Sequence, residues 1–459
     1  MHVRYARPHR SALAALVGAT ALAASFIAPT PSQATAVPAP ATPGTMQPAV
    51  GVHPHFTSAG NATRTPQGVT FGCQTTTPAR CYGPDQIRAA YGVDKLAARG
   101  LDGRGRTIVI VDAYSSPTIQ QDLGLFDSLF GLPAADLQVV APQGLAPFDP
   151  SDPVQVGWSG EITLDVEWAH AIAPGAAIKL VLAKSSNDAD ILAAISYAVD
   201  HNLGDVISQS YGEAEQCMDR RVLDRQHELF ARASERGITL LAASGDLGAA
   251  QYTCDGNSFF QAASTPATDP NVTSVGGTTL VADGTTGAYQ GETVWNDQYG
   301  SGGGGFSVVY RAPQYQRSLG LRSRGVPDVA YNADVYSGVL TVWTQAPGTQ
   351  PGVWLFGGTS AGSPQWAGLV ALADQARHGR VGQINTSLYA LARNPRGYAY
   401  DFHDVTAGNN GEPPITNGFS ATAGWDAASG LGSPRADHLV PLLALAGGRN
   451  SQGEDHNSQ

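Results

Sequence analysis

Charged residues are scarce in this chain, and basic ones are scarcer than acidic ones. Only 14% of its 459 residues are Asp, Glu, Lys or Arg, against roughly 25% in an average soluble protein. The formal net charge is −11, and Lys95, Lys179 and Lys184 are the only lysines. A chain with so little positive charge offers no basic surface for nucleic acid or an anionic membrane. We therefore expect neither of these as a partner.

Cysteines and long apolar runs are also rare. No Cys-x-x-Cys or Cys/His pair has the spacing of a zinc site, which argues against a transition metal. The cysteines number four, and in an exported protein an even count favours disulfides. Pairing by proximity along the chain gives Cys73–Cys81 and Cys217–Cys254. Beyond the N-terminus, no stretch is long and apolar enough to span a bilayer.

The N-terminus is typical of an export signal. Three arginines precede an alanine-rich apolar stretch, and "ATA" at 34–36 fits a small-x-small cleavage site. We predict a signal peptide over residues 1–36 and secretion; a membrane anchor is the alternative. Residues 37–78 are rich in Pro, Thr and Gly and lack periodicity, so they are predicted to be a linker or short pro-segment. The polar residues 447–459 are predicted to be a disordered tail.

Between these ends, residues 79–446 show strands alternating with helices. The runs "RTIVIVDAY" (106–114), "AIKLVLA" (177–183), "DVISQSYG" (205–212) and "ITLLAASGD" (238–246) are rich in β-branched and aliphatic residues. Helical stretches lie between them, which predicts an α/β domain with a mostly parallel central sheet and helices on both faces. Functional sites in such sheets gather where strands end and loops begin.

One serine is presented in an unusual way. In "FGGTSAGSPQWAGLVALADQA" (356–376), a Gly-Gly turn precedes Thr359 and Ser360, and a helix with Pro364 in its first turn follows at once. A hydroxyl there lies beside unpaired backbone N–H groups that favour developing negative charge. An N-cap serine without chemistry is the alternative. The longer pattern G-T-S-x-x-x-P resembles the nucleophile segment of subtilisin-like peptidases.

Such a serine needs a base. Subtilisins supply a histidine from an H-G-T-H segment, and this chain has no such segment. His170 comes late in its helix and is predicted to be a core or C-terminal histidine. In "GWSGEITLDVEW" (157–168), Glu161 and Asp165 share a helix face four residues apart. Two carboxyls that close cannot both ionise easily, so one pKa rises and the pair can share a proton. Glu167 has no role in this hypothesis and is assigned to a solvated helix face.

A third carboxyl follows an aliphatic strand in "LLAASGDLGA" (240–249). Asp246 stands where a subtilisin-like layout supplies the side chain of the oxyanion hole. A carboxyl group can donate a hydrogen bond there only when it is protonated. A turn aspartate beside glycine is the alternative.

These segments together resemble the sedolisin family of serine-carboxyl peptidases, over roughly Tyr82 to Ala446. The resemblance extends to "SGGGGFS" (301–307), "RGVPDVAYNADVYSG" (324–338) and "FHDVTAGNNG" (402–411). It implies a subtilisin-like fold, with Ser360 as nucleophile, Glu161 as base, Asp165 as its partner and Asp246 as oxyanion donor. We further expect a monomeric, acid-active peptidase acting on proteins or peptides. We expect an endopeptidase, with a tripeptidyl-peptidase as the alternative. The family is usually made with a folded prodomain, for which residues 37–78 are too short.

The same resemblance implies one structural Ca²⁺ in a C-terminal calcium loop. "HDVTAGNNG" and "TAGWDAASGLG" are similar to the family's loop, in which two residues offer side-chain oxygens and three offer carbonyls. Oxygen ligands, two of them anionic, suit Ca²⁺. The side chains are those of Asp404 and Asp426, and the carbonyls are those of Val405, Thr422 and Gly424.

Two other functions stay open at this point. A histidine-dependent peptidase of the subtilisin type would need His170 at the serine. A secreted binding protein could keep the fold and have lost turnover.

Overall fold

The computed structural model describes residues 55–65 and 68–446. The predicted signal peptide and the predicted C-terminal tail lie outside these ranges. Within them, no helix is long and apolar enough to cross a membrane.

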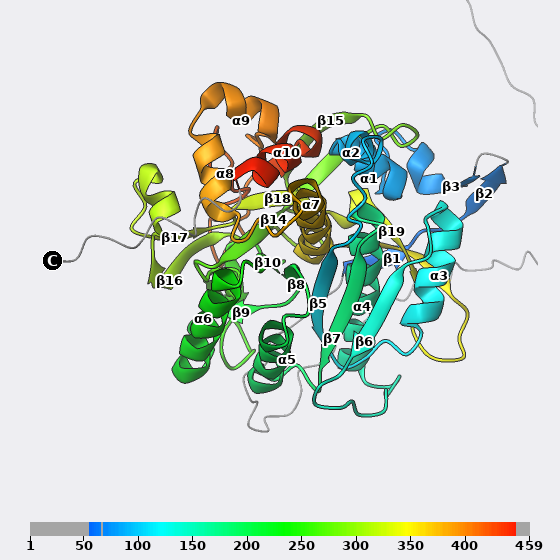
Figure 1. The fold of residues 1–459 in the computed structure, drawn as a ribbon, viewed down its shortest axis with the longest axis horizontal. Helices are drawn as coiled ribbons and strands as arrows, with labels where there is room; N and C mark the ends of the chain where they lie inside the picture. Colours follow the sequence, from blue (N-terminus) through cyan, green and yellow to red (C-terminus); the bar gives the residue numbers. More distant parts are fainter. Residues whose placement is uncertain (1–54, 66–67, 447–459) are drawn as a thin grey trace, which may run out of the picture. The chain divides into compact units, whose positions relative to one another are not determined.

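A central sheet of eight strands organises the domain, in the order β15-β14-β10-β8-β5-β7-β6, with β18 also pairing with β14 (Figure 1). All neighbours are parallel except β14 and β15. The predicted α/β fold with a mostly parallel sheet is therefore confirmed. The strands are β5 (Thr107–Ala113), β6 (Asp136–Val140), β7 (Ala177–Ala183), β8 (Val206–Gln209), β10 (Thr239–Ala243), β14 (Val272–Ala282), β15 (Tyr289–Val294) and β18 (Val329–Asn332).

Helices cover both faces of this sheet, and strand β5 shows how. Its residues Ile108 and Ile110 belong to one apolar cluster, which includes side chains of α4 (Pro153–Ile172) and α7 (Gly362–Arg377). Val109 and Val111 belong to another, with side chains of α5 (Asp188–Asp200) and α6 (Arg220–Glu235). Alternate residues of a strand point to opposite faces, so a strand buried on both sides reads as a continuous apolar run.

A second sheet has four strands in the order β1-β20-β19-β4. Its strands β1 and β4 precede the central sheet in sequence, and β19 and β20 follow it. Its strands are β1 (His55–Ser58), β4 (Cys81–Tyr82), β19 (Gly338–Trp343) and β20 (Gly352–Gly357). Periodicity predicted no strand before residue 79, yet β1, the hairpin β2 (Ala62–Thr65) and β3 (Gly68–Phe71), and the turn η1 (Gly72–Thr75) lie there. These strands have at most four residues, too few to show a period. Disulfides join Cys73 to Cys81 and Cys217 to Cys254, as predicted.

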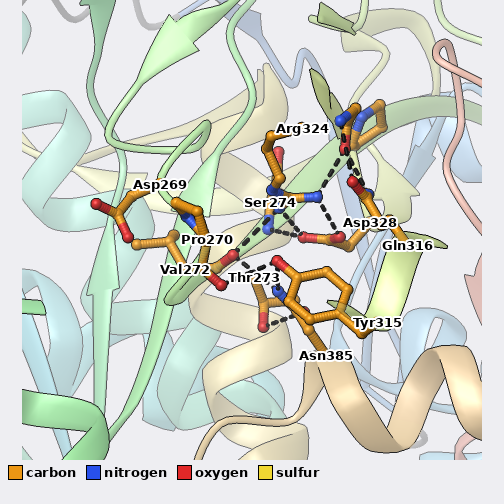
Figure 2. A network of polar contacts seen from close by, with 12 residues as sticks. Asp269, Pro270, Val272, Thr273, Ser274, Tyr315, Gln316, Arg324, Asp328 and Asn385 are labelled. Carbon is orange, nitrogen blue, oxygen red and sulfur yellow. Dashed lines mark hydrogen bonds and ion pairs between the residues drawn. The ribbon is translucent and has the colours of Figure 1, made fainter. Parts of the chain in front are cut away.

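A buried ion pair between Arg324 and Asp328 is hydrogen-bonded to β14 (Figure 2). The guanidinium of Arg324 donates to both carboxylate oxygens of Asp328, and both side chains are fully buried. Asp328 also accepts hydrogen bonds from the backbone N–H of Ser274 (2.8 Å) and the hydroxyl of Tyr389 (2.8 Å). Because the charges are paired and further hydrogen-bonded, their burial is tolerated.

The other elements are shorter or peripheral. The helices are α1 (Pro84–Ala90), α2 (Val93–Ala97), α3 (Ile119–Phe130), α8 (Asn385–Ala392), α9 (Pro395–Asp401) and α10 (Ala436–Ala446). The strands are β9 (Glu213–Ala214), β11 (Ala250–Tyr252), β12 (Phe259–Gln261), β13 (Ser264–Thr265), β16 (Gly305–Arg311), β17 (Ser323–Val326), β21 (Phe402–His403) and β22 (Ser433–Pro434). Three 3-10 turns are η2 (Gln314–Leu319), η3 (Val335–Ser337) and η4 (Thr359–Ala361).

Candidate active site

Helix α4 carries two carboxyl groups into the interior of the domain. The helix begins after Asp152, whose side chain accepts a hydrogen bond from the backbone N–H of Val154. From Trp158 to Ile172 every residue is buried, and Glu161 and Asp165 have no exposed surface. Because they are four residues apart, they lie on the same face of the helix, as predicted.

Burial and mutual proximity both favour the protonated forms of these carboxyls. Burial raises the pKa of Glu161 well above its usual range, Asp112 raises it further, and a contact with the Ser360 hydroxyl opposes the shift. Burial, Asp112 and Glu161 likewise raise the pKa of Asp165, whose Oδ1 accepts a hydrogen bond of 2.9 Å from the Ser210 hydroxyl. A group of carboxyls in such surroundings retains protons that isolated carboxyls lose.

Asp112, near the end of β5, is a third member of this group that sequence reasoning missed. It is fully buried, and neither of its oxygens has a hydrogen-bond partner among the described residues. Burial raises its pKa to about 8. The phenol of Tyr211 lies beside the group, since Asp112 and Asp165 both add to the rise that burial causes in its pKa. The available signal was the acidic residue inside the otherwise apolar run "TIVIVDA".

Ser360 lies in the 3-10 turn η4 that joins β20 to α7. Gly357 and Gly358 precede it, and Gly358 has a φ of +98°, which L side chains rarely adopt. A Cβ atom on Gly358 would lie 2.5 Å from Oδ2 of Asp246. The glycine therefore lets the turn approach Asp246. Ser360 is 8% exposed and faces Glu161, with no hydrogen bond of ordinary length and angle to either Glu161 oxygen. Catalytic hydrogen bonds are often long without substrate.

Asp246 follows β10 and is fixed by the turn that holds Ser360. Its Oδ1 accepts hydrogen bonds of 2.7 Å from both the backbone N–H and the hydroxyl of Thr359. The backbone N–H of Gly245 donates in turn to the Thr359 hydroxyl oxygen (3.1 Å). These bonds engage Oδ1 and leave Oδ2 without a hydrogen bond from Thr359. The charge of Asp246 also acts on Glu161. The structure thus brings together all four predicted catalytic residues.

His170 lies elsewhere on α4, as predicted. It is fully buried in the last turn, with Nε2 2.9 Å from the carbonyl oxygen of Pro133 and 3.2 Å from Oδ1 of Asp127. These partners belong to α3 and the loop after it, so the ring is held in the core. It gives no support to a histidine-dependent mechanism.

The assignment of Glu167 to a solvated face is wrong. The residue is fully buried, and its Oε2 accepts a hydrogen bond of 2.9 Å from the backbone N–H of Val342 in β19. Burial raises its pKa well above the usual range, this hydrogen bond opposes the shift, and Asp122 and Asp127 add to it. Since α4 is covered on all sides after its first turns, it has no solvated face there.

The predicted calcium loop lies around β21 and β22. Oδ1 of Asp404 accepts a hydrogen bond of 2.9 Å from the Tyr398 hydroxyl, and the N–H of Gly424 points at both Asp404 oxygens (3.2 and 3.1 Å). Asp426 accepts from the N–H of Thr422 (2.8 Å). Burial, Asp404 and Asp426 all raise the pKa of Tyr398, so both carboxylates lie near one phenol.

The charges in this loop fit a cation. Among the ion pairs of residues 55–65 and 68–446, none joins Asp404 or Asp426 to Lys, Arg or His. Nearby carboxylates without a basic partner suit a hard cation with oxygen ligands. No cluster of three or more His, Cys, Asp or Glu that could hold a metal occurs in the described part of the chain. A site of two carboxylates and backbone carbonyls would not form such a cluster.

The chain is similar to known peptidases over most of its length. A family model described as the subtilase family matches residues 159–390. Kumamolisin of Bacillus sp. (strain MN-32) is 35% identical over 378 residues, which are 79% of this chain and 63% of that protein. Tripeptidyl-peptidase 1 of Dictyostelium discoideum is 27% identical over 386 residues, 78% of this chain and 58% of that one. The chain thus spans less than two thirds of these two relatives.

The fold also matches that of a solved structure over nearly the whole of the solved chain. The structure of Pseudomonas sedolisin, a serine-carboxyl proteinase complexed with two molecules of pseudo-iodotyrostatin, matches with a TM-score of 0.69 and 30% identity. The match covers 80% of this chain and 99% of that one. On this fold, this identity and the shared motifs, the chain belongs to the sedolisin family of serine-carboxyl peptidases.

Proposed function

We propose that the protein is a secreted, acid-active endopeptidase that cleaves proteins or peptides through an acyl-enzyme on Ser360. The observation that carries the proposal is the position of Ser360, which faces a buried group of three carboxyls instead of a histidine. A carboxyl group donates a hydrogen bond to an oxyanion only while it is protonated, so the role given to Asp246 ties the chemistry to acid.

Each step uses a group at the site. Oγ of Ser360 forms a bond to the scissile carbonyl carbon while its proton passes to Glu161. Glu161 can accept it when the proton that the pair shares lies on Asp165, which also orients Glu161. Asp246, protonated on Oδ2, donates to the oxygen that becomes negative, as does the backbone at the start of α7. The C–N bond breaks, and the proton on Glu161 goes to the leaving amine. Water then attacks the acyl carbon and gives a proton to Glu161. The bond between this carbon and Oγ breaks, Oγ takes the proton back from Glu161, and the carboxylic acid product leaves.

A calcium ion is proposed as a structural part of the enzyme. When bound, it would supply a charge that balances Asp404 and Asp426. The carbonyls of Val405, Thr422 and Gly424 would complete the donor set and so fix the shape of this loop. Among the described residues, no hydrogen bond of these five goes to Ser360 or Asp246, so we assign the ion no part in the peptide-bond chemistry.

Digestion of an unfolded protein at pH 3 to 8 tests the proposal. The full chain should cleave inside reduced, carboxymethylated albumin in acid and lose activity toward neutral pH, and Ser360→Ala should remove the activity. His170→Gln, checked by thermal melting for an intact fold, should keep it. A binding protein on the same fold would show no Ser360-dependent cleavage. A neutral or alkaline optimum would refute the role given to Asp246. Release of tripeptides alone would refute the endopeptidase assignment.

A further inference from the structure

Strand β1 covers the edge of β20 beside the catalytic turn. The two strands are antiparallel, with His55 opposite Gly357, Phe56 opposite Phe356 and Ser58 opposite Trp354. The other edge of β20 is paired with β19. Since β20 leads directly through Gly358 to Ser360, β1 begins next to the catalytic turn and runs away from it.

His55, the first described residue of β1, lies beside Asp246. Its Nε2 is 3.9 Å from Oδ2 of Asp246, the oxygen that Thr359 leaves free. Its ring packs edge-on against Trp295, with 5.9 Å between ring centroids. The first residue of β1 therefore lies at the proposed oxyanion donor, and the chain continues outward along β20.

β1 runs in the direction that the part of a substrate after the scissile bond would take. When a serine cleaves a peptide, the residues after the scissile bond run from N to C away from the nucleophile. Residues 55–58 run in this direction from the catalytic turn. An exposed strand edge binds an extended peptide through its backbone N–H and C=O groups, while pockets for alternate side chains give specificity.

One such pocket holds Phe56. Its ring lies against three aromatic rings, with centroid distances of 5.0 Å to Trp343, 5.5 Å to Trp354 and 5.4 Å to Phe356. A pocket with aromatic walls and no charged lining side chain among these contacts favours a large apolar group. Because His55 is at Asp246, the pocket lies one residue further from the reacting centre.

We propose that the edge of β20 binds the leaving-group side of the substrate and that the Phe56 pocket selects a large apolar side chain there. This inference rests on the proposed peptidase function and adds a specificity element to it. Residues 55–58 occupy the edge as an internal competitor, which a substrate has to displace. A tethered competitor acts at high effective concentration, so weak docking of four residues still raises the substrate concentration needed for turnover.

Mapping the new N-termini of carboxymethylated albumin fragments by mass spectrometry tests the pocket. We expect Phe, Tyr, Trp and Leu to be enriched at least threefold at the second or third residue after the cut. Trp354→Ala should remove the enrichment, and Tyr400→Ala, an exposed aromatic on α9, should not change it. An even distribution in the wild-type protein, with cleavage still dependent on Ser360, would overturn the inference and leave the peptidase function standing.

A second experiment tests the competitor. In the full chain, Phe56→Ala should lower KM at least threefold with kcat unchanged, because the tethered strand then docks less tightly. On this variant, acetyl-His-Phe-Thr-Ser-amide should inhibit at least tenfold more strongly than the peptide with Ala in place of Phe. Equal inhibition by the two peptides would overturn the pocket, and an unchanged KM would overturn the competition.

The two proposals can fail separately. If no variant hydrolyses protein in acid, the peptidase function fails. Binding of the same two peptides to the Phe56→Ala, Ser360→Ala double variant, followed by tryptophan fluorescence, then decides the pocket. Preference for the Phe peptide supports it, and equal or absent binding refutes it.

Discussion

The buried carboxyl of Asp112 should make the free energy of unfolding depend on pH, and this can be tested without enzymatic activity. Its pKa rises from 3.8 to about 8 on burial, so the folded protein binds a proton there that the unfolded chain releases between these values. Stability from this group is fully present below pH 3.8 and is lost as pH rises toward 8. At 1.36 kcal/mol per pH unit, the loss between pH 3.8 and pH 7 is about 4 kcal/mol. Asn cannot ionise, so Asp112→Asn should remove that loss.

The assay is urea unfolding from pH 3.5 to 7.5, with Ser360→Ala in every variant to prevent self-digestion. The free energy of unfolding of Asp112→Asn should match that of the parent at pH 3.5 and exceed it by up to about 4 kcal/mol at pH 7. Asp112 also raises the pKa values of Glu161 and Asp165. Asp112→Asn should therefore also weaken the pH dependence of stability that these two groups cause. Asp94→Asn, at an exposed position in α2, is the control. A parallel pH dependence in parent and Asp112→Asn would refute the reasoning.

Three further predictions concern other parts of the chain. Gly358→Ala should lower kcat at least tenfold, because its Cβ would lie 2.5 Å from Oδ2 of Asp246. Gly379→Ala, whose Cβ would have nothing within 4 Å, should leave kcat unchanged, and kinetics on one peptide substrate check both variants. Asp328→Asn should cost about 3–5 kcal/mol in urea unfolding because it leaves the buried Arg324 unpaired; a loss below about 1 kcal/mol would contradict it. At 100 times its Kd, Ca²⁺ should stabilise the protein by about 2.7 kcal/mol. Asp404→Asn should abolish this shift in melting, and persistence of the shift would place the ion elsewhere.

Much of the central sheet could be predicted from the sequence because its strands are buried on both faces. Such strands are runs of apolar residues with helices between them, and β5, β7, β8 and β10 all follow this pattern. The turn at Ser360 and the spacing of Glu161 and Asp165 are local features, so a short sequence motif contains them. The structure brings them together as expected.

What the sequence did not reveal depends on contacts between distant segments. Asp112 looked like the end of an apolar strand, and only the packing of α4 on β5 shows that it joins the buried carboxyls. Glu167 looked solvated because its helix carries other polar residues, but tertiary contacts bury the helix on all sides. Strand β1 forms by pairing with residues about 300 positions later, and four residues carry no periodic signal of this.

The pairing of β1 with β20 also bears on how the protein associates with itself. Release of β1 would leave residues 352–357 as an unpaired strand edge, and such edges pair readily with strands of other chains. The same four residues of a second molecule fit this edge as well as the chain's own. Mutual exchange of β1 would link two molecules into a dimer, in a concentration-dependent manner, without any new surface. Whatever displaces β1 must therefore also occupy the edge for the protein to stay a monomer.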